Sequence, residues 1–305
     1  MNRQCLNSYI LYSTLRTQYD TPDSALAEQV KAAMSTQVSP DNRMAVYGQS
    51  SVRARLFGGH VLSARVTAPG SRILQELLYP GGSLRDEQLR EPKLRASHFG
   101  APADRDGFGV GNKHGALRYT TYEKVRRPCG TLLLRASLPE VGIATERELV
   151  IRRDRLGIND TLEVIRPDGD EATSLLNHLY LNRGKVMPST DNPVLINGET
   201  LDDLLHEDGV GDRIVSGEPY LWTGFGDVPS ATVSMPDGSQ IGVSATINGE
   251  NVNAALLWAP KGENAFCIEP VDGLSEEGNR GRIIPAGGSA LLAVTVTAIQ
   301  GTLAA

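Results

Sequence analysis

From Arg43 onward the sequence is a series of short β-branched runs separated by turn-forming residues. Glycine, proline, asparagine and aspartate cluster at the breaks, and the 305-residue chain holds 32 glycines and 17 prolines. In the last of these runs Val294 and Val296 face one side and the intervening threonines face the other, as in a half-buried strand. Strands and turns in this rhythm favour a mainly β sandwich or barrel over βαβ units. The clearest predicted strands are Val61–Val66, Thr131–Ala136, Glu148–Ile151, Thr161–Ile165, Ile241–Ile247 and Leu291–Ala298.

The first part of the chain has a different texture. Thr21–Ser24 is typical of a helix start, Ala25–Met34 contains good helix formers, and Ser39–Asn42 is typical of a turn. We therefore expect residues 1–42 to be an N-terminal extension with one short helix, and residues 43–305 to be the main β domain. Leu201–Leu205 is a candidate for one further short helix.

Charge and hydropathy exclude several classes of partner. The net charge is −6 and the isoelectric point is about 5.5, which argues against a general nucleic-acid binder, although a local basic pocket for one sugar phosphate is compatible with it. No run approaches the ~20 apolar residues that span a bilayer, and the N-terminus lacks the features of a signal peptide. The three cysteines stand far apart, without a CxxC pair. A cytoplasmic protein with reduced thiols and no membrane partner is expected.

Two polar or glycine-rich segments are read as loops. Gly107–Gly111 lacks the strand, helix and spacing of a dinucleotide fingerprint, so no nucleotide cofactor is expected. Asp202–Asp208 is rich in acidic residues around His206, but its spacing fits no known metal site. A solvated acidic helix end is the simpler interpretation, and no metal is expected.

Three segments combine histidine or glutamate with aromatic neighbours: Lys113–Glu123, Leu176–Asn182 and Phe266–Gly273. Glu269 follows a run that is typical of a buried strand, where a carboxylate is costly unless it has partners. A carboxylate at the end of one core strand and histidines at the ends of others would converge on one concave face. Such a face suits acid–base chemistry.

These segments resemble the three signature blocks of the aldose 1-epimerase (galactose mutarotase) family. His114, Gly115 and Arg118, with Tyr122 behind them, are similar to its HGFxRxxxW block. The run from Asn177 to Asn182 is similar to its NHxYFN block, and Ile268–Pro270 to its glutamate block. Flanking turns at Gly58–Ser63 and Ile284–Ser289 agree, so the resemblance covers about residues 43–300. It implies a β-supersandwich of antiparallel sheets with the site in a cleft on one sheet.

The resemblance also implies roles for individual residues. Glu269 would be the catalytic base and His178 the catalytic acid that together open and reclose a pyranose ring. Unperturbed pKa values of about 4.3 for Glu and 6.5 for His suit this pair near neutrality. The substrate-binding residues would be His114, Arg118, Tyr180 and Asn182. No metal and no cofactor are implied, and the partner is a small sugar or sugar phosphate.

The sequence departs from the family pattern at three positions. Ala116 replaces an aromatic residue, Tyr122 replaces Trp and Leu181 replaces Phe, and we expect these changes to reshape the sugar pocket. The alternatives are a hexose-6-phosphate mutarotase, a non-catalytic carbohydrate-binding or sensing protein, and lyase or isomerase chemistry on the same scaffold. A phosphate pocket would draw on Arg105, Lys113 and Arg118. The sequence leaves the oligomeric state open.

Overall fold

The computed structural model describes residues 42–71, 74–79, 98–103, 117, 120–139, 142–167, 171–272, 274–275, 278–279 and 282–299. The predicted N-terminal helix lies outside these residues. So do Gly107–Gly111, the phosphate-pocket candidates Arg105 and Lys113, and the site candidates His114 and Arg118.

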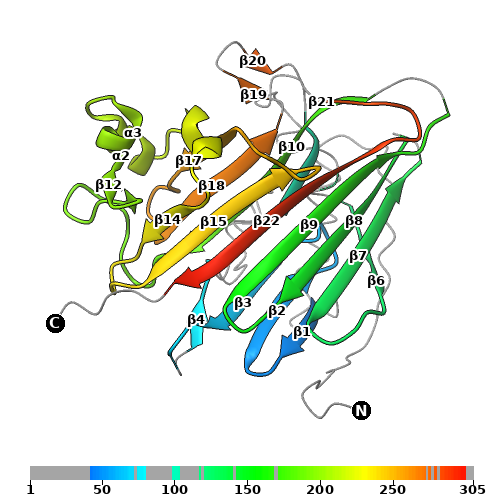
Figure 1. The fold of residues 1–305 in the computed structure, drawn as a ribbon, viewed down its shortest axis with the longest axis horizontal. Coiled ribbons are helices and arrows are strands. Elements are labelled where there is room, and N and C mark those ends of the chain that lie inside the picture. The colour runs from blue at the N-terminus through cyan, green and yellow to red at the C-terminus, as the bar shows by residue number, and fades with distance from the viewer. Residues whose placement is uncertain are drawn as a thin grey trace.

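The first layer is a ten-stranded antiparallel sheet, the large sheet, which faces the viewer in Figure 1. Its order is β12-β11-β14-β15-β22-β9-β8-β7-β6, and β16 pairs with β15. Its strands are β6 (Glu123–Val125), β7 (Thr131–Leu138), β8 (Ile143–Ile151), β9 (Arg155–Val164), β11 (Leu195–Ile196), β12 (Glu199–Thr200), β14 (Ala231–Ser234), β15 (Gln240–Ile247), β16 (Glu250–Asn251) and β22 (Ser289–Ile299).

The second layer contains a six-stranded sheet, the second sheet, with the order β13-β17-β18-β10-β21 and with β5 paired to β10. Its strands are β5 (His98–Ala103), β10 (Glu171–Asn182), β13 (Tyr220–Trp222), β17 (Ala254–Trp258), β18 (Ala265–Asp272) and β21 (Arg282–Ile284). A four-stranded sheet packs beside it against the large sheet and is made of β1 (Asn42–Tyr47), β2 (Ser50–Arg55), β3 (Val61–Thr67) and β4 (Leu74–Glu76).

The remaining elements are short. Two short strands, β19 (Leu274–Ser275) and β20 (Gly278–Asn279), pair with each other. The helices α2 (Leu201–Leu205), α3 (Val210–Val215) and η3 (Thr223–Asp227) lie between β12 and β14 in the chain. Figure 1 shows α2 and α3 next to β12, the strand at that edge of the large sheet.

One hydrophobic core lies between the layers. β8 alternates strictly between buried and half-buried positions, and the outward side of the large sheet is more exposed than its inward side. Leu149 and Val294 of the large sheet belong to the same buried cluster as Leu179 of β10 and Ile268 of β18. β10 packs against β22 and β18 against β15, whereas β2 and β3 pack against β8 and β9. The inner faces of both layers are therefore mainly apolar, as the packing of one sheet on another requires.

The predicted mainly β fold is confirmed. Each predicted strand falls on an observed one, and Leu201–Leu205 is α2. The sequence analysis missed α3, because a helix of six residues carries too little periodicity to stand out from a polar loop. Among the described residues no helix is long and apolar enough to cross a membrane. The cytoplasmic location stays a prediction.

The turn between β2 and β3 depends on glycine. Gly59 has a φ of +58°, and a Cβ there would lie 3.3 Å from both the Arg147 Cδ and the Tyr122 ring. Arg147 and Tyr122 are both fully buried and have little room to move aside. Gly48 has a similar φ of +60°, but a Cβ there would meet nothing within 4 Å. A comparison of alanine substitutions at the two glycines therefore distinguishes the cost of a positive φ, which both share, from the cost of crowding, which arises only at Gly59.

We expect Gly59→Ala to lower the free energy of unfolding by roughly 2–3 kcal/mol, against roughly 1 kcal/mol for Gly48→Ala. Both variants incur the cost of a positive φ, and only Gly59→Ala also crowds the core. Urea-induced unfolding followed by tryptophan fluorescence measures both values. Equal losses in the two variants would contradict the close approach at Gly59.

Candidate functional site

The site begins with the alternation of side chains along β10. Leu179 and Leu181 point into the core between the layers. His178, Tyr180 and Asn182 stand at the alternate positions and so point to the opposite face of the second sheet. This outer face carries polar and aromatic side chains where the inner face carries leucine.

Strand β18 presents its own polar side chains on the same outer face. Phe266 and Ile268 lie in the core, so Cys267 and Glu269 point outward. The antiparallel register pairs Leu179 with Ile268, which places His178 directly opposite Glu269. The Nε2 atom of His178 lies 3.0 Å from the Oε1 atom of Glu269, and each side chain is only 5% exposed. An imidazole and a carboxylate are thus held side by side by two hydrogen-bonded strands.

The pair lies between two clusters of different character on the outer face. An apolar cluster lies toward one side and consists of Leu176, Leu221, Ala254, Leu256 and Val271. An aromatic and thiol cluster lies toward the other side and consists of Tyr79, Tyr180, Trp258, Ala265 and Cys267. Apolar surroundings strengthen the interaction between a carboxylate and an imidazole, because water screens it less.

The aromatic rings orient His178. Its imidazole stacks on the Tyr180 ring, with centroids 4.4 Å apart, and the Trp258 ring meets it edge-on at 6.0 Å. Trp258 is itself fixed by a hydrogen bond from its Nε1 to the carbonyl oxygen of Gly217, at 2.8 Å. Packing of this kind holds a catalytic side chain in one orientation.

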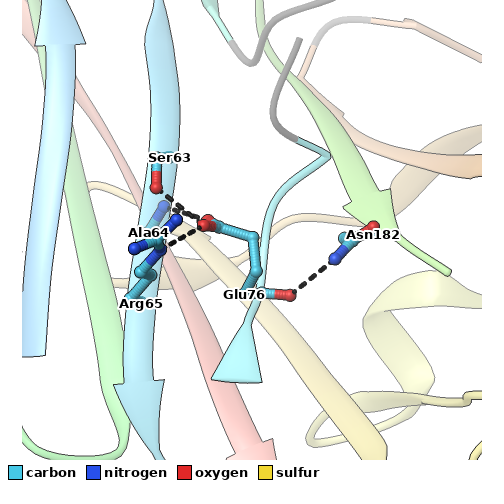
Figure 2. A network of polar contacts seen from close by, with 5 residues as sticks. All are labelled: Ser63, Ala64, Arg65, Glu76 and Asn182. Carbon is cyan, nitrogen blue, oxygen red and sulfur yellow. Dashed lines mark hydrogen bonds and ion pairs between the residues drawn. The ribbon is translucent and has the colours of Figure 1, made fainter. Parts of the chain in front are cut away.

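Asn182, expected to bind substrate, has its amide engaged with the backbone. Its Nδ2 donates to the Glu76 carbonyl oxygen at 3.3 Å, and its Oδ1 accepts from the Gly184 N–H at 3.1 Å. Figure 2 shows that it reaches from β10 to β4 in this way. The Glu76 carboxylate in turn accepts hydrogen bonds from the Ser63 hydroxyl (2.7 Å), the Ala64 N–H (2.5 Å) and the Arg65 Nε (3.1 Å). Asn182 therefore fastens two sheets together, and its substrate-binding role stays a prediction.

Two expectations from the sequence need correction. Glu269 and His178 lie within their strands and not at the strand ends, because both strands continue beyond them. Tyr122 and Leu181 were expected to reshape the sugar pocket, but both side chains belong to the core between the layers. Their replacement of larger aromatic residues therefore changes core packing. Ala116 lies outside the described residues.

The sequence analysis missed the aromatic residues that surround the pair. Trp258 pairs with Cys267 across β17 and β18, and Tyr79 follows β4, far away in the chain. The only available signal was the unbroken apolar run Ala254–Trp258, which is compatible with a buried strand but does not identify the neighbouring strand. Cys267 was quoted in the glutamate block without a role.

Among the described residues, His178, Cys267 and Glu269 form a group of potential metal ligands, with donor atoms all within 4.8 Å of one another. Asp202 instead accepts hydrogen bonds from the backbone of Gly209 (2.8 Å) and Gly211 (2.6 Å), in keeping with a solvated helix end. The buried thiol of Cys267 is not part of a disulfide bond.

Comparison with solved structures identifies the architecture. A protein from Synechocystis sp. PCC 6803 superposes with a TM-score of 0.61 at 18% identity, over 84% of this chain and 95% of the other. A galactose mutarotase-like protein from Lactobacillus casei ATCC 334 superposes with a TM-score of 0.56 at 13% identity, over 84% and 99%. The fold is galactose mutarotase-like. A candidate aldose 1-epimerase from Escherichia coli K12 has this mutarotase-like fold too, with a TM-score of 0.60 at 13% identity over 85% and 100%.

Comparisons of sequence do not extend this result. No family model matches the chain, and no curated protein matches it. The mutarotase-like fold is thus shown by structure, and the chemistry must be argued from the His178–Glu269 pair.

Proposed function

We propose that this protein interconverts the α and β anomers of an aldose, with Glu269 as the base and His178 as the acid. The observation that carries the proposal is the 3.0 Å separation of the His178 Nε2 and the Glu269 Oε1 on the outer face of the second sheet. The solved structures with the same fold include a candidate aldose 1-epimerase and a galactose mutarotase-like protein, which supports the choice of reaction class.

The geometry suits mutarotation because the two oxygens that must exchange protons are bonded to the same carbon. Glu269 takes the proton of the C1 hydroxyl while the bond from C1 to the ring oxygen breaks and His178 protonates that oxygen. The open-chain aldehyde then rotates about the bond between C1 and C2. Reversal of both proton transfers recloses the ring on the other face. A base and an acid that lie side by side can serve both oxygens at once, and the reaction has no net proton change.

The outer face also offers a platform for the sugar. The rings of Tyr180 and Trp258 lie 6.0 Å apart at an interplanar angle of 71°. Aromatic rings with polar edges suit a molecule that carries both C–H and hydroxyl groups. His114 and Arg118 complete the site in this proposal, where they hydrogen-bond the sugar and hold Glu269 ionised.

Magnetisation-transfer NMR tests the proposal, because it reports exchange between anomers at equilibrium. The full chain is screened against a panel of free aldoses and their 6-phosphates. Exchange above the buffer rate on free aldoses is expected. Exchange on the 6-phosphates alone would replace the substrate with a hexose phosphate. No exchange on any sugar, with binding still detectable, would overturn the proposal in favour of a sugar-binding protein.

A further inference from the structure

We propose that Cys267, His178 and Glu269 form a binding site for one thiophilic divalent cation, such as Zn²⁺, and that the bound ion silences the acid–base pair. The cation site follows from the three side chains alone. Its effect on catalysis rests on the proposed function.

Two neighbouring strands hold the three donors. Cys267 and Glu269 are alternate residues of β18 and so share the outer face, and His178 stands opposite Glu269 on β10. Cys267 also pairs with Tyr180 in this register and with Trp258 on the other side of β18. Donors on hydrogen-bonded strands are more rigidly placed than donors on loops, as a metal site requires.

The donor atoms nearly match the dimensions of a zinc site. Bonds of about 2.0–2.3 Å to N, O and S, arranged tetrahedrally, put the donors roughly 3.3–3.6 Å apart. In the structure the imidazole nitrogen, thiol sulfur and carboxylate oxygen all lie within 4.8 Å of one another, and one pair is already 3.0 Å apart. A shift of about 1 Å, within the reach of side-chain rotation, closes the rest. Three protein ligands leave a fourth position for water.

Charge favours an ion here. Cys267 is fully buried, and His178 and Glu269 are nearly so. When Zn²⁺ binds, the thiol releases its proton to solvent, and the thiolate and the carboxylate together neutralise the two positive charges. A buried site with no net charge avoids most of the desolvation penalty of an isolated ion. The mixed sulfur, nitrogen and oxygen ligands select zinc-like ions over Mg²⁺ and Ca²⁺, which prefer oxygen alone.

The bound ion and the sugar exclude each other. Coordination occupies the Glu269 oxygen that would take the C1 proton and the His178 nitrogen that would protonate the ring oxygen. A metal chelator then restores exchange by removing the ion. The pair is thus switched off by coordination without any change of fold.

Metal titration of the full chain tests the site. Chelator-stripped protein is titrated with Zn²⁺ against a chromophoric zinc indicator, and with Co²⁺ to look for the near-ultraviolet thiolate-to-cobalt charge-transfer band. We expect one tight equivalent and a clear band. Cys267→Ser should abolish the band and weaken Zn²⁺ binding by more than the roughly 10–100-fold that loss of an outer-shell partner causes. The matched control, His206→Asn, changes an exposed histidine at the end of α2 and should bind as the unmodified chain does.

The outcomes separate this inference from the proposed function. Binding of Zn²⁺ with a charge-transfer band, in a protein that exchanges no sugar anomers, upholds the site and rejects the enzyme. Anomer exchange that Zn²⁺ leaves unchanged, in a protein without the band, rejects the site and upholds the enzyme. Because the Co²⁺ spectrum is taken on the unmodified chain, it decides the question even where Cys267→Ser folds poorly. Equal Zn²⁺ affinity of a folded Cys267→Ser variant would also overturn the site.

Discussion

Glu269→Gln is expected to slow anomer exchange by about 10²–10⁴-fold, the contribution of one well-placed proton transfer. Glutamine has the shape of glutamate and keeps an oxygen that can lie beside the His178 Nε2, but it cannot take the C1 proton. Replacing a buried carboxylate by a neutral amide also lowers the cost of burial, so the fold is retained. Magnetisation transfer on the preferred aldose gives the rate, and far-ultraviolet circular dichroism checks the fold.

The matched control is Glu163→Gln. Glu163 lies on β9 of the large sheet with its side chain exposed, whereas the His178–Glu269 pair lies on the second sheet, so the same chemical change there leaves exchange unaltered. His178→Asn should reproduce the loss seen with Glu269→Gln, because both residues are needed for ring opening and again for ring closure. Exchange at the native rate by a folded Glu269→Gln or His178→Asn protein would refute the assigned roles.

Local patterns in the sequence were sufficient to predict the strands. β22 was read from alternating valine and threonine, and the observed strand alternates in burial as expected. The opposition of His178 and Glu269 could be inferred only through the family resemblance. Their motifs lie 91 positions apart (269 − 178), and nothing local to either motif specifies a register.

The residues that surround the His178–Glu269 pair could not be predicted either, because local sequence does not specify which strands are adjacent. Trp258 and Cys267 stand beside His178 because β17, β18 and β10 are adjacent, and strand order is a tertiary property. Asn182 belongs to the same motif as His178, and on motif grounds alone it was assigned to the substrate. In the structure its amide hydrogen-bonds the backbone of β4, an element that the sequence analysis did not predict. A motif gives residue types, and the sheet decides which groups they face.

The core-facing side of β10, opposite to the side that carries His178, contributes Asn177 to a buried polar group with Asp160 and Arg147. Asn177 donates from its Nδ2 to the Asp160 Oδ2 at 2.6 Å across the core. The Asp160 Oδ1 lies 3.6 Å from the Arg147 Nη1, and both charged side chains are fully buried. Burial raises the pKa of Asp160 to about 6, although Arg147 and Asn177 both act to lower it. Because the folded pKa exceeds the unfolded value of about 3.9, the carboxylate costs stability as the pH rises through 6.

Asp160→Asn is therefore expected to lower the free energy of unfolding by roughly 3–5 kcal/mol at neutral pH, since it leaves a buried guanidinium that cannot deprotonate. Arg147→Met leaves a carboxyl group that can bind a proton instead. Without Arg147 the pKa of Asp160 rises further, so this variant is least damaged below its raised pKa and loses stability as the pH increases from 5 to 8. Urea unfolding at both pH values measures the difference.

The double variant, Arg147→Met with Asp160→Asn, isolates the interaction between the two charges. It removes both charges, keeps an oxygen at position 160 for the Asn177 amide, and should lose less stability than the sum of the single losses by about 1–3 kcal/mol. Its stability should also fall less between pH 5 and pH 8 than that of Arg147→Met, because the titrating carboxyl group is gone. Since it contains no uncompensated buried charge, it remains measurable even where Asp160→Asn fails to fold. Strictly additive losses, or an Arg147→Met stability that does not fall with pH, would show that Arg147 and Asp160 do not act as a charged pair in the core.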